Sequence, residues 1–247
     1  MEGNPDPRGA RRALVATWAK AIGLLAIARA ASTLDPTGLA RSNLGAVAAL
    51  LFILLPDREL RRRGETWGGQ GLPWWGATDA RTWRAWARGA LEGLAICAVV
   101  LPVFALAFLG FAEIAARLNG PRPDVLRLPL RLPAGFALLA VTQLLVVALP
   151  EEMFYRGYLQ TGWARSAPGR RVRVLGADLG AGFLSTQLLF AAGHLVSLDP
   201  WRLLTFFPAL LFGWARERTN GLAAPVFVHA VSNLFLAVLE AGLPGAR

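Results

Sequence analysis

Long apolar runs with few charged side chains dominate this chain of 247 residues. A helix that crosses the hydrocarbon core of a bilayer needs about 20 consecutive, mostly apolar residues, and its backbone groups must be satisfied within the helix. The runs therefore predict an all-α, polytopic transmembrane helical bundle of about six to eight spans. The four strongest runs are residues 89–115, 133–149 with a polar continuation, 175–198 and 222–239, and three weaker ones are 14–31, 43–55 and 201–214.

The composition agrees with an integral membrane protein, because 55% of the residues are hydrophobic and only 17% are charged, with a mean hydropathy of +0.44. The formal net charge of +10 would ordinarily suggest nucleic-acid binding. Here the arginines lie between the apolar runs, where they can pair with lipid phosphates. We therefore expect membrane lipids as partners and no nucleic acid.

The distribution of arginine predicts the orientation. With a cytoplasmic N-terminus and seven crossings, sixteen arginines face the cytoplasm and seven face outside. This bias favours a multi-pass protein of the inner (cytoplasmic) membrane, although the cluster in residues 117–131 falls on the outer side. An alternative for residues 13–31 is a signal peptide, since Arg11 and Arg12 precede a short apolar core and Ala28-Arg29-Ala30 resembles a cleavage site.

The segments between the apolar runs are short, which predicts a single integrated membrane domain. Its N-terminal part, residues 1–132, contains a segment rich in Trp and Arg at 60–88. Tryptophan favours the headgroup region, so a surface helix is expected there. Residues 133–240 form the second part and carry the polar groups discussed next. Cys97 is the only cysteine and lies in an apolar run, so no disulfide within the chain is expected.

Two adjacent acids, Glu151 and Glu152, follow the apolar run that begins at residue 133. On a helix, Glu152 and Arg156 are four residues apart in the order that favours an ion pair, whereas Glu151 points about 100° away. Glu151 is thus left free to take a proton from water as a general base. The alternative is that both acids cap a helix that begins at Pro150.

The chain has two histidines, and both lie in apolar runs. His194 follows small residues that let another helix approach closely, and His229 shares a helix face with Asn233, four residues later. Each could simply form a hydrogen bond between helices. Ionisable groups within spans are costly, however, and usually mark a functional site.

The sequence lacks the motifs of serine, aspartyl and zinc-dependent intramembrane proteolysis. A water nucleophile remains, with Glu151 and His194 to deprotonate and orient it. His229 and Asn233 would then stabilise the tetrahedral oxyanion.

Three motifs together carry a resemblance to a known family: Glu-Glu-x-x-x-Arg at 151–156, Phe-x-x-x-His at 190–194 and His-x-x-x-Asn at 229–233. The chain resembles the CPBP family of CAAX prenyl proteases and bacteriocin-processing enzymes over residues 133–240. The resemblance implies an all-helical glutamic intramembrane endopeptidase. In it Glu151, His194, His229 and Asn233 are catalytic, and Glu152, Arg156 and Phe190 support the site.

Several questions stay open at this point. Candidate substrates are CAAX-like tails, leader peptides and C-terminal sorting tails of membrane-associated proteins. The chain could instead be an inactive scaffold or immunity-type binding protein. It could also be a metal-dependent hydrolase or an ion transporter, because Glu151, Glu152, His194 and His229 are all able to bind zinc. No cofactor is expected, and whether a metal takes part is not decided by the sequence.

Overall fold

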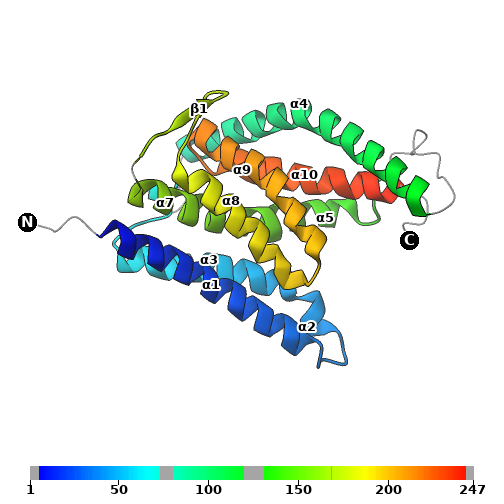
Figure 1. Ribbon diagram of the computed structural model, residues 1–247, viewed down its shortest axis with the longest axis horizontal. Coiled ribbons are helices and arrows are strands. Elements are labelled where there is room, and N and C mark those ends of the chain that lie inside the picture. Colours follow the sequence, from blue (N-terminus) through cyan, green and yellow to red (C-terminus); the bar gives the residue numbers. More distant parts are fainter. Residues whose placement is uncertain (1–5, 73–79, 120–130, 168, 243–247) are drawn as a thin grey trace, which may run out of the picture.

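The computed structural model describes residues 6–72, 80–119, 131–167 and 169–242. In these ranges the chain is almost entirely helical, which confirms the predicted all-α bundle (Figure 1). The helices are α1 (Pro7–Ser32), α2 (Leu39–Ser42), α3 (Leu44–Arg62), α4 (Ala80–Asn119), α8 (Ala181–His194), α9 (Phe206–Thr219) and α10 (Ala223–Gly242). Short 3₁₀ segments are η1 (Gly68–Gln70), η5 (Leu195–Ser197) and η6 (Pro200–Thr205).

One long helix, residues 136–166, runs through the middle of the bundle and alternates between α and π geometry. Its parts are α5 (Phe136–Thr142), η3 (Gln143–Ala148), α6 (Leu149–Glu152), η4 (Met153–Gln160) and α7 (Thr161–Ser166). The π segments η3 and η4 flank α6, which carries the two acids. Pro150 has no N–H to donate to the preceding turn, so a regular α-helical ladder is interrupted here. π-Helical turns are rare and often occur at functional sites.

The part of the central helix that follows Glu151 is shielded from the surroundings by the other helices, whereas α5 at its start has no buried residue. Every residue of η4 is buried, whereas only 6% of the most apolar window of α4 is buried. In Figure 1, α1 and α3 cover one side of the central helix and α10 with α4 covers the other, while α8 and α9 lie across it. The acids are therefore held inside protein, and the outer helices present the apolar surface that lipid requires.

Four described helices are long and apolar enough to cross a membrane, so the protein is a multi-pass membrane protein. They are Pro7–Ser32, Ala80–Ile114, Phe136–Ser166 and Ala223–Gly242. The six to eight predicted spans include three further apolar runs whose helices are shorter or charged. Helix α3 has 19 residues with a charged last turn, and α8 and α9 have 14 residues each. The chain nevertheless runs back and forth through all of these helices (Figure 1).

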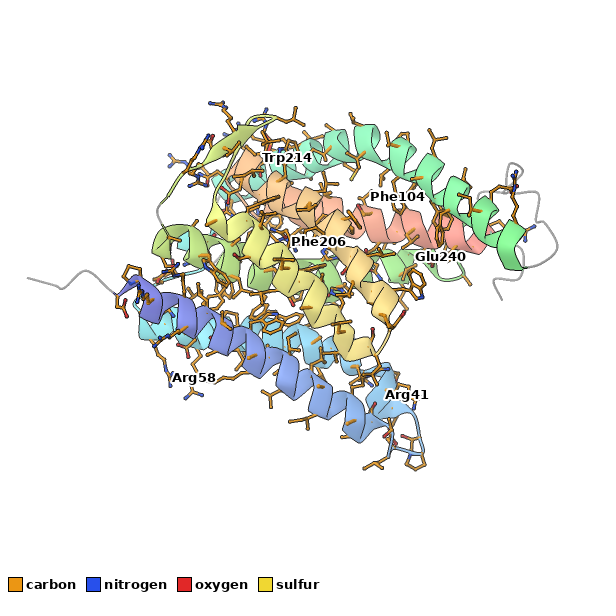
Figure 2. The ribbon with its side chains drawn as sticks, viewed as in Figure 1. Arg41, Arg58, Phe104, Phe206, Trp214 and Glu240 are labelled. Carbon is orange, nitrogen blue, oxygen red and sulfur yellow. The ribbon has the colours of Figure 1, made fainter. Side chains whose placement is uncertain are left out.

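The same reversals bring most arginine-rich segments to one end of the bundle, which we call the arginine-rich end. Helices α1 and α4 begin there, and α3, α7 and α9 finish there (Figure 1). Arg58 marks this end of the α1–α3 layer and Arg41 marks the opposite end (Figure 2). Salt bridges tie the arginine-rich end together, for example Arg165 with Glu65 at 2.6 Å and Arg171 with Glu217 at 2.7 Å.

The predicted span at 175–198 is wrong in its first six residues. Strand β1 (Val172–Val174) pairs antiparallel with β2 (Ala177–Leu179), and the helix begins only at Ala181. The turn residues Leu175 and Gly176 have φ of 47° and 83°. Positive φ at both turn residues is the geometry of a two-residue hairpin of type I′, and glycine adopts it without strain. The apolar residues of this run thus serve a hairpin.

The expected surface helix in residues 60–88 is not a separate element in the described part of this segment. Trp83 and Trp86 belong to α4, which begins at Ala80, while Trp74 and Trp75 lie outside the described residues. Trp67 is buried, and its indole N–H donates to Asp57 Oδ1 at 3.0 Å. This tryptophan therefore packs in the protein core.

Two glycines let α4 pack tightly on α10, the helix that carries His229. A methyl group on Gly89 would collide with the side chain of Ala223, and one on Gly93 would lie 3.0 Å from the carbonyl oxygen of Ala224. We expect Gly89→Ala to destabilise the protein by about 1–3 kcal/mol through overpacking. Thermal unfolding in detergent measures this. Gly110→Ala is the matched control in the same helix, because nothing lies within 4 Å of its added methyl; equal melting temperatures would contradict the packing argument.

Candidate functional site

A fully buried ion pair forms the base of the site. The side chains of Glu152 and Arg156 both have an exposure of 0%, and Arg156 Nη1 donates to Glu152 Oε1 at 2.8 Å. Arg156 Nη2 also donates to Gln187 Oε1 at 2.9 Å and to the carbonyl of Ala209 at 3.0 Å. The predicted ion pair is thus present. Buried charges are tolerated only when they are paired and hydrogen-bonded, and these contacts join the central helix to α8 and α9.

His229 of α10 lies between the two acids. Its Nδ1 is 2.8 Å from Glu152 Oε1, and its Nε2 is 3.9 Å from Glu151 Oε2. Because an ionised carboxylate only accepts, Nδ1 carries the hydrogen of the shorter contact. The imidazole also stacks on Phe212, with ring centroids 4.5 Å apart and planes inclined by 16°. The ring is therefore fixed by a carboxylate on its edge and an aromatic ring on its face.

Glu151 is the acid left outside the ion pair. Its side chain is 17% exposed, and its buried Oε2 has no hydrogen-bond partner among the described residues. The separation from His229 Nε2 is too long for a direct hydrogen bond. Glu151 and His194 both line a cavity of about 380 Å³. A buried acceptor without a partner is rare in folded proteins, and it calls for a donor such as a water or a substrate group.

His194 reaches the same cavity from α8. Its Nδ1 is 2.9 Å from the carbonyl oxygen of Phe190, which can only accept, so this nitrogen is the donor. In the neutral ring Nε2 is then an acceptor. The Phe190 ring lies 4.6 Å from the His194 ring and 4.6 Å from Arg156 Cζ, and it meets Tyr155 edge-on at 4.9 Å. Phe190 thereby packs against both the histidine and the ion pair.

Asn233 lies one helical turn beyond His229 on α10. Its Nδ2 donates a hydrogen bond to Gln143 Oε1 at 2.8 Å. The structure thus gathers Glu151, Glu152 and His229 and places His194 on the cavity of Glu151. Asn233 instead contacts the first π segment, η3.

A chain of polar side chains extends from the ion pair toward the arginine-rich end. Gln187 Nε2 donates to Gln160 Oε1 at 3.0 Å, and Gln160 Nε2 donates to Glu217 Oε1 at 2.9 Å. Sequence reasoning missed this network, although Gln187 precedes His194 by two helical turns and so lies on the same face. Sequence reasoning also missed Phe212, for which spacing along the chain offers no signal.

Metal binding was left open by the sequence. Within residues 6–72, 80–119, 131–167 and 169–242, no group of three or more His, Cys, Asp or Glu side chains is arranged to hold a metal ion.

Comparison with known families gives a match to this region. A family model described as "Type II CAAX prenyl endopeptidase Rce1-like" matches residues 133–235, the segment that supplies both acids, both histidines, Arg156 and Asn233. Neither the curated proteins nor the solved structures gave a match.

Proposed function

We propose that this chain, whose residues 133–235 match the Rce1-like family of type II CAAX prenyl endopeptidases, hydrolyses peptide bonds with a water activated by Glu151 and His194. The observation that carries the proposal is the buried, unpartnered Oε2 of Glu151 on a cavity shared with His194. A general base must hold an acceptor within hydrogen-bond reach of the water it deprotonates.

In the proposed reaction, Glu151 Oε2 takes one proton from the water, while His194 Nε2 accepts a hydrogen bond from the other O–H and so orients the attacking lone pair. The water oxygen attacks the carbonyl carbon, and the π electrons of the C=O bond move onto the carbonyl oxygen. The tetrahedral intermediate collapses with cleavage of the C–N bond, and the proton held by Glu151 passes to the departing amine. One water is consumed, its second hydrogen stays on the new carboxyl group, and the acid and amine then ionise to a carboxylate and an ammonium group.

The oxyanion needs N–H donors in the intermediate. We assign His229 and Asn233 to this role, as the sequence predicts. His229 already donates through Nδ1 to Glu152, so it offers an Nε2–H only as imidazolium. Asn233 uses one amide hydrogen on Gln143 and retains a second. Glu152 and Arg156 act as positioning residues that hold His229.

The proposal extends to topology and substrate. The arginine-rich end supports a cytoplasmic N-terminus in the inner membrane. Residues 133–240 form the catalytic part, and residues 1–132 shape access to it, because α1 and α3 supply much of the cavity wall. Substrates are membrane-associated proteins or peptides cut near a terminus: a CAAX-like tail, a leader peptide or a C-terminal sorting tail.

Comparative membrane proteomics tests the function. Cells that lack the chain are compared with cells that carry it unaltered or as Glu151→Ala, and terminal peptides are quantified. We expect uncut terminal segments to accumulate in the deletion and Glu151→Ala cells alike. Normal processing by a stably expressed Glu151→Ala chain would refute the proposed base, and identical termini in all three would favour an inactive scaffold.

His194 offers an independent test of water activation. We expect His194→Gln to lower the cleavage rate by about 100-fold, because general acid–base groups contribute roughly 10²–10⁴. Ser185→Ala is the matched control on the same helix, since among the described residues its hydroxyl donates to the carbonyl of Ala181 one turn earlier and contacts no residue of the site. An unchanged rate in His194→Gln would remove His194 from the mechanism.

A further inference from the structure

The cavity above Glu151 and His194 has a second charged feature. Besides these two residues and Tyr155, it is lined by Arg29 and Arg202. Arg29 is in the last turn of α1 and Arg202 is in η6, so both lie toward the end opposite the arginine-rich end. Apolar side chains of α1 and α3 complete the wall: Leu25, Leu44, Ala48 and Phe52.

Neither arginine is neutralised by a carboxylate of the described chain. Arg29 Nη2 donates to the carbonyl oxygen of Ser197 at 2.9 Å, and the exposed Arg202 side chain has no hydrogen bond or ion pair among the described residues. Some other arginines do pair with acids, as Arg61 does with Asp57 at 2.7 Å. Two positive charges thus line one cavity, and Glu151 is the only acid on its wall.

The acids on the neighbouring loops are already engaged in local turns. Asp35 accepts hydrogen bonds from the backbone of Thr37 and Ala40 at 2.9 and 2.7 Å, and Asp199 accepts from the backbone of Trp201 at 3.1 Å. These carboxylates cap their own segments. A carboxylate that bound both arginines would therefore come from outside the described chain.

We propose that Arg29 and Arg202 bind a carboxylate of the peptide substrate, so that the bond to be cut lies over Glu151. The inference rests on the proposed function, because it gives that site its substrate-recognition element. Guanidinium groups form strong, directional hydrogen bonds to carboxylates, most of all where apolar walls exclude water. The carboxylate is either the chain terminus of the substrate or an Asp or Glu side chain.

A membrane-lipid phosphate is the competing occupant. Arginines at the membrane surface commonly pair with lipid headgroups, and a cation is favourable at the C-terminal end of a helix. The peptide is the better occupant here because the same cavity also contains Glu151 and His194. A lipid phosphate would need only an exposed position such as that of Arg41.

A binding experiment in the Glu151→Gln background tests the inference without requiring cleavage. The probes are dansyl-Leu-Ala-Leu-Ala as the free acid, its C-terminal amide, and the amide with Asp in place of the third residue. Each is titrated against the purified full chain in detergent. We expect the free acid or the Asp probe to bind about tenfold tighter than the plain amide, and Arg29→Gln to abolish most of that preference.

Arg202→Gln should reduce the preference less, because Arg202 is exposed. Arg41→Gln is the matched control, an arginine at the same end that does not line the cavity. Whichever acid binds tighter identifies the source of the carboxylate.

Equal binding of all three probes, or a preference that survives the double arginine variant, would overturn the inference. The inference would also be overturned if the double arginine variant lost binding to phosphatidylglycerol in nanodiscs but kept its binding to the peptide probes. A carboxylate preference without proteolysis in unaltered cells would instead refute the proposed function.

Discussion

Replacing Glu151 by glutamine is expected to lower the rate of peptide-bond cleavage by about 10³-fold and to leave the melting temperature almost unchanged. The amide keeps the size of the side chain but cannot take a proton from water, and a general base contributes roughly 10²–10⁴ in rate. Among the described residues its Oε2 has no hydrogen-bond partner, and Arg156 is bound to Glu152 instead. Cleavage of a substrate found by proteomics, followed with purified protein, measures the loss.

Glu240→Gln is the matched control for that variant. Glu240 is an exposed acid near the end of α10 (Figure 2), and its replacement should leave the rate unchanged. A folded Glu151→Gln protein that cleaves as fast as this control would mean that another group activates the nucleophile.

Arg156→Ala is expected to have the largest effect on stability. It leaves the Glu152 carboxylate fully buried without a cation and removes the links to Gln187 and Ala209. Breaking a buried ion pair by removing one partner costs about 3–5 kcal/mol. Denaturant unfolding in detergent micelles measures the change. Arg62→Ala is the control, since its exposed pair with Glu59 should contribute at most about 1 kcal/mol.

A double variant separates stability from chemistry. Glu152→Gln combined with Arg156→Met removes both charges and keeps an acceptor for His229, so it should recover much of the stability lost in Arg156→Ala. Its activity should stay low, because His229 then lacks its carboxylate. If the double variant were no more stable than Arg156→Ala, the cost would lie in packing instead of in the unpaired charge.

Local spacing predicted those parts of the site that lie on one helix. The four-residue interval between Glu152 and Arg156 gave their ion pair, and the rotation of one residue gave the separate position of Glu151. The two histidines were found because ionisable groups are costly in apolar runs. The contacts between helices could not be obtained in this way. Phe212 of α9 stacks on His229 of α10, and the periodicity of a sequence does not show which helices pack against each other.

Other features of the structure also have no signal in local spacing. Residues 175–198 are apolar enough for a span, yet two residues with positive φ turn the first part into a hairpin. Asn233 shares a helix face with His229, but the π segment η3 presents Gln143 to it, and π geometry has no signature in the sequence read alone. Arg29 also lines the cavity of Glu151, and its position near the N-terminus gives no signal of this.

The most direct test of the account is a single-turnover cleavage in H₂¹⁸O with the purified chain and a substrate peptide identified by proteomics. If a water activated at Glu151 attacks the carbonyl carbon, every new carboxylate carries one ¹⁸O atom in the first turnover, and the Glu151→Gln chain yields almost no product. An unlabelled carboxylate from the unaltered chain, or labelled product formed at the normal rate by Glu151→Gln, would contradict it.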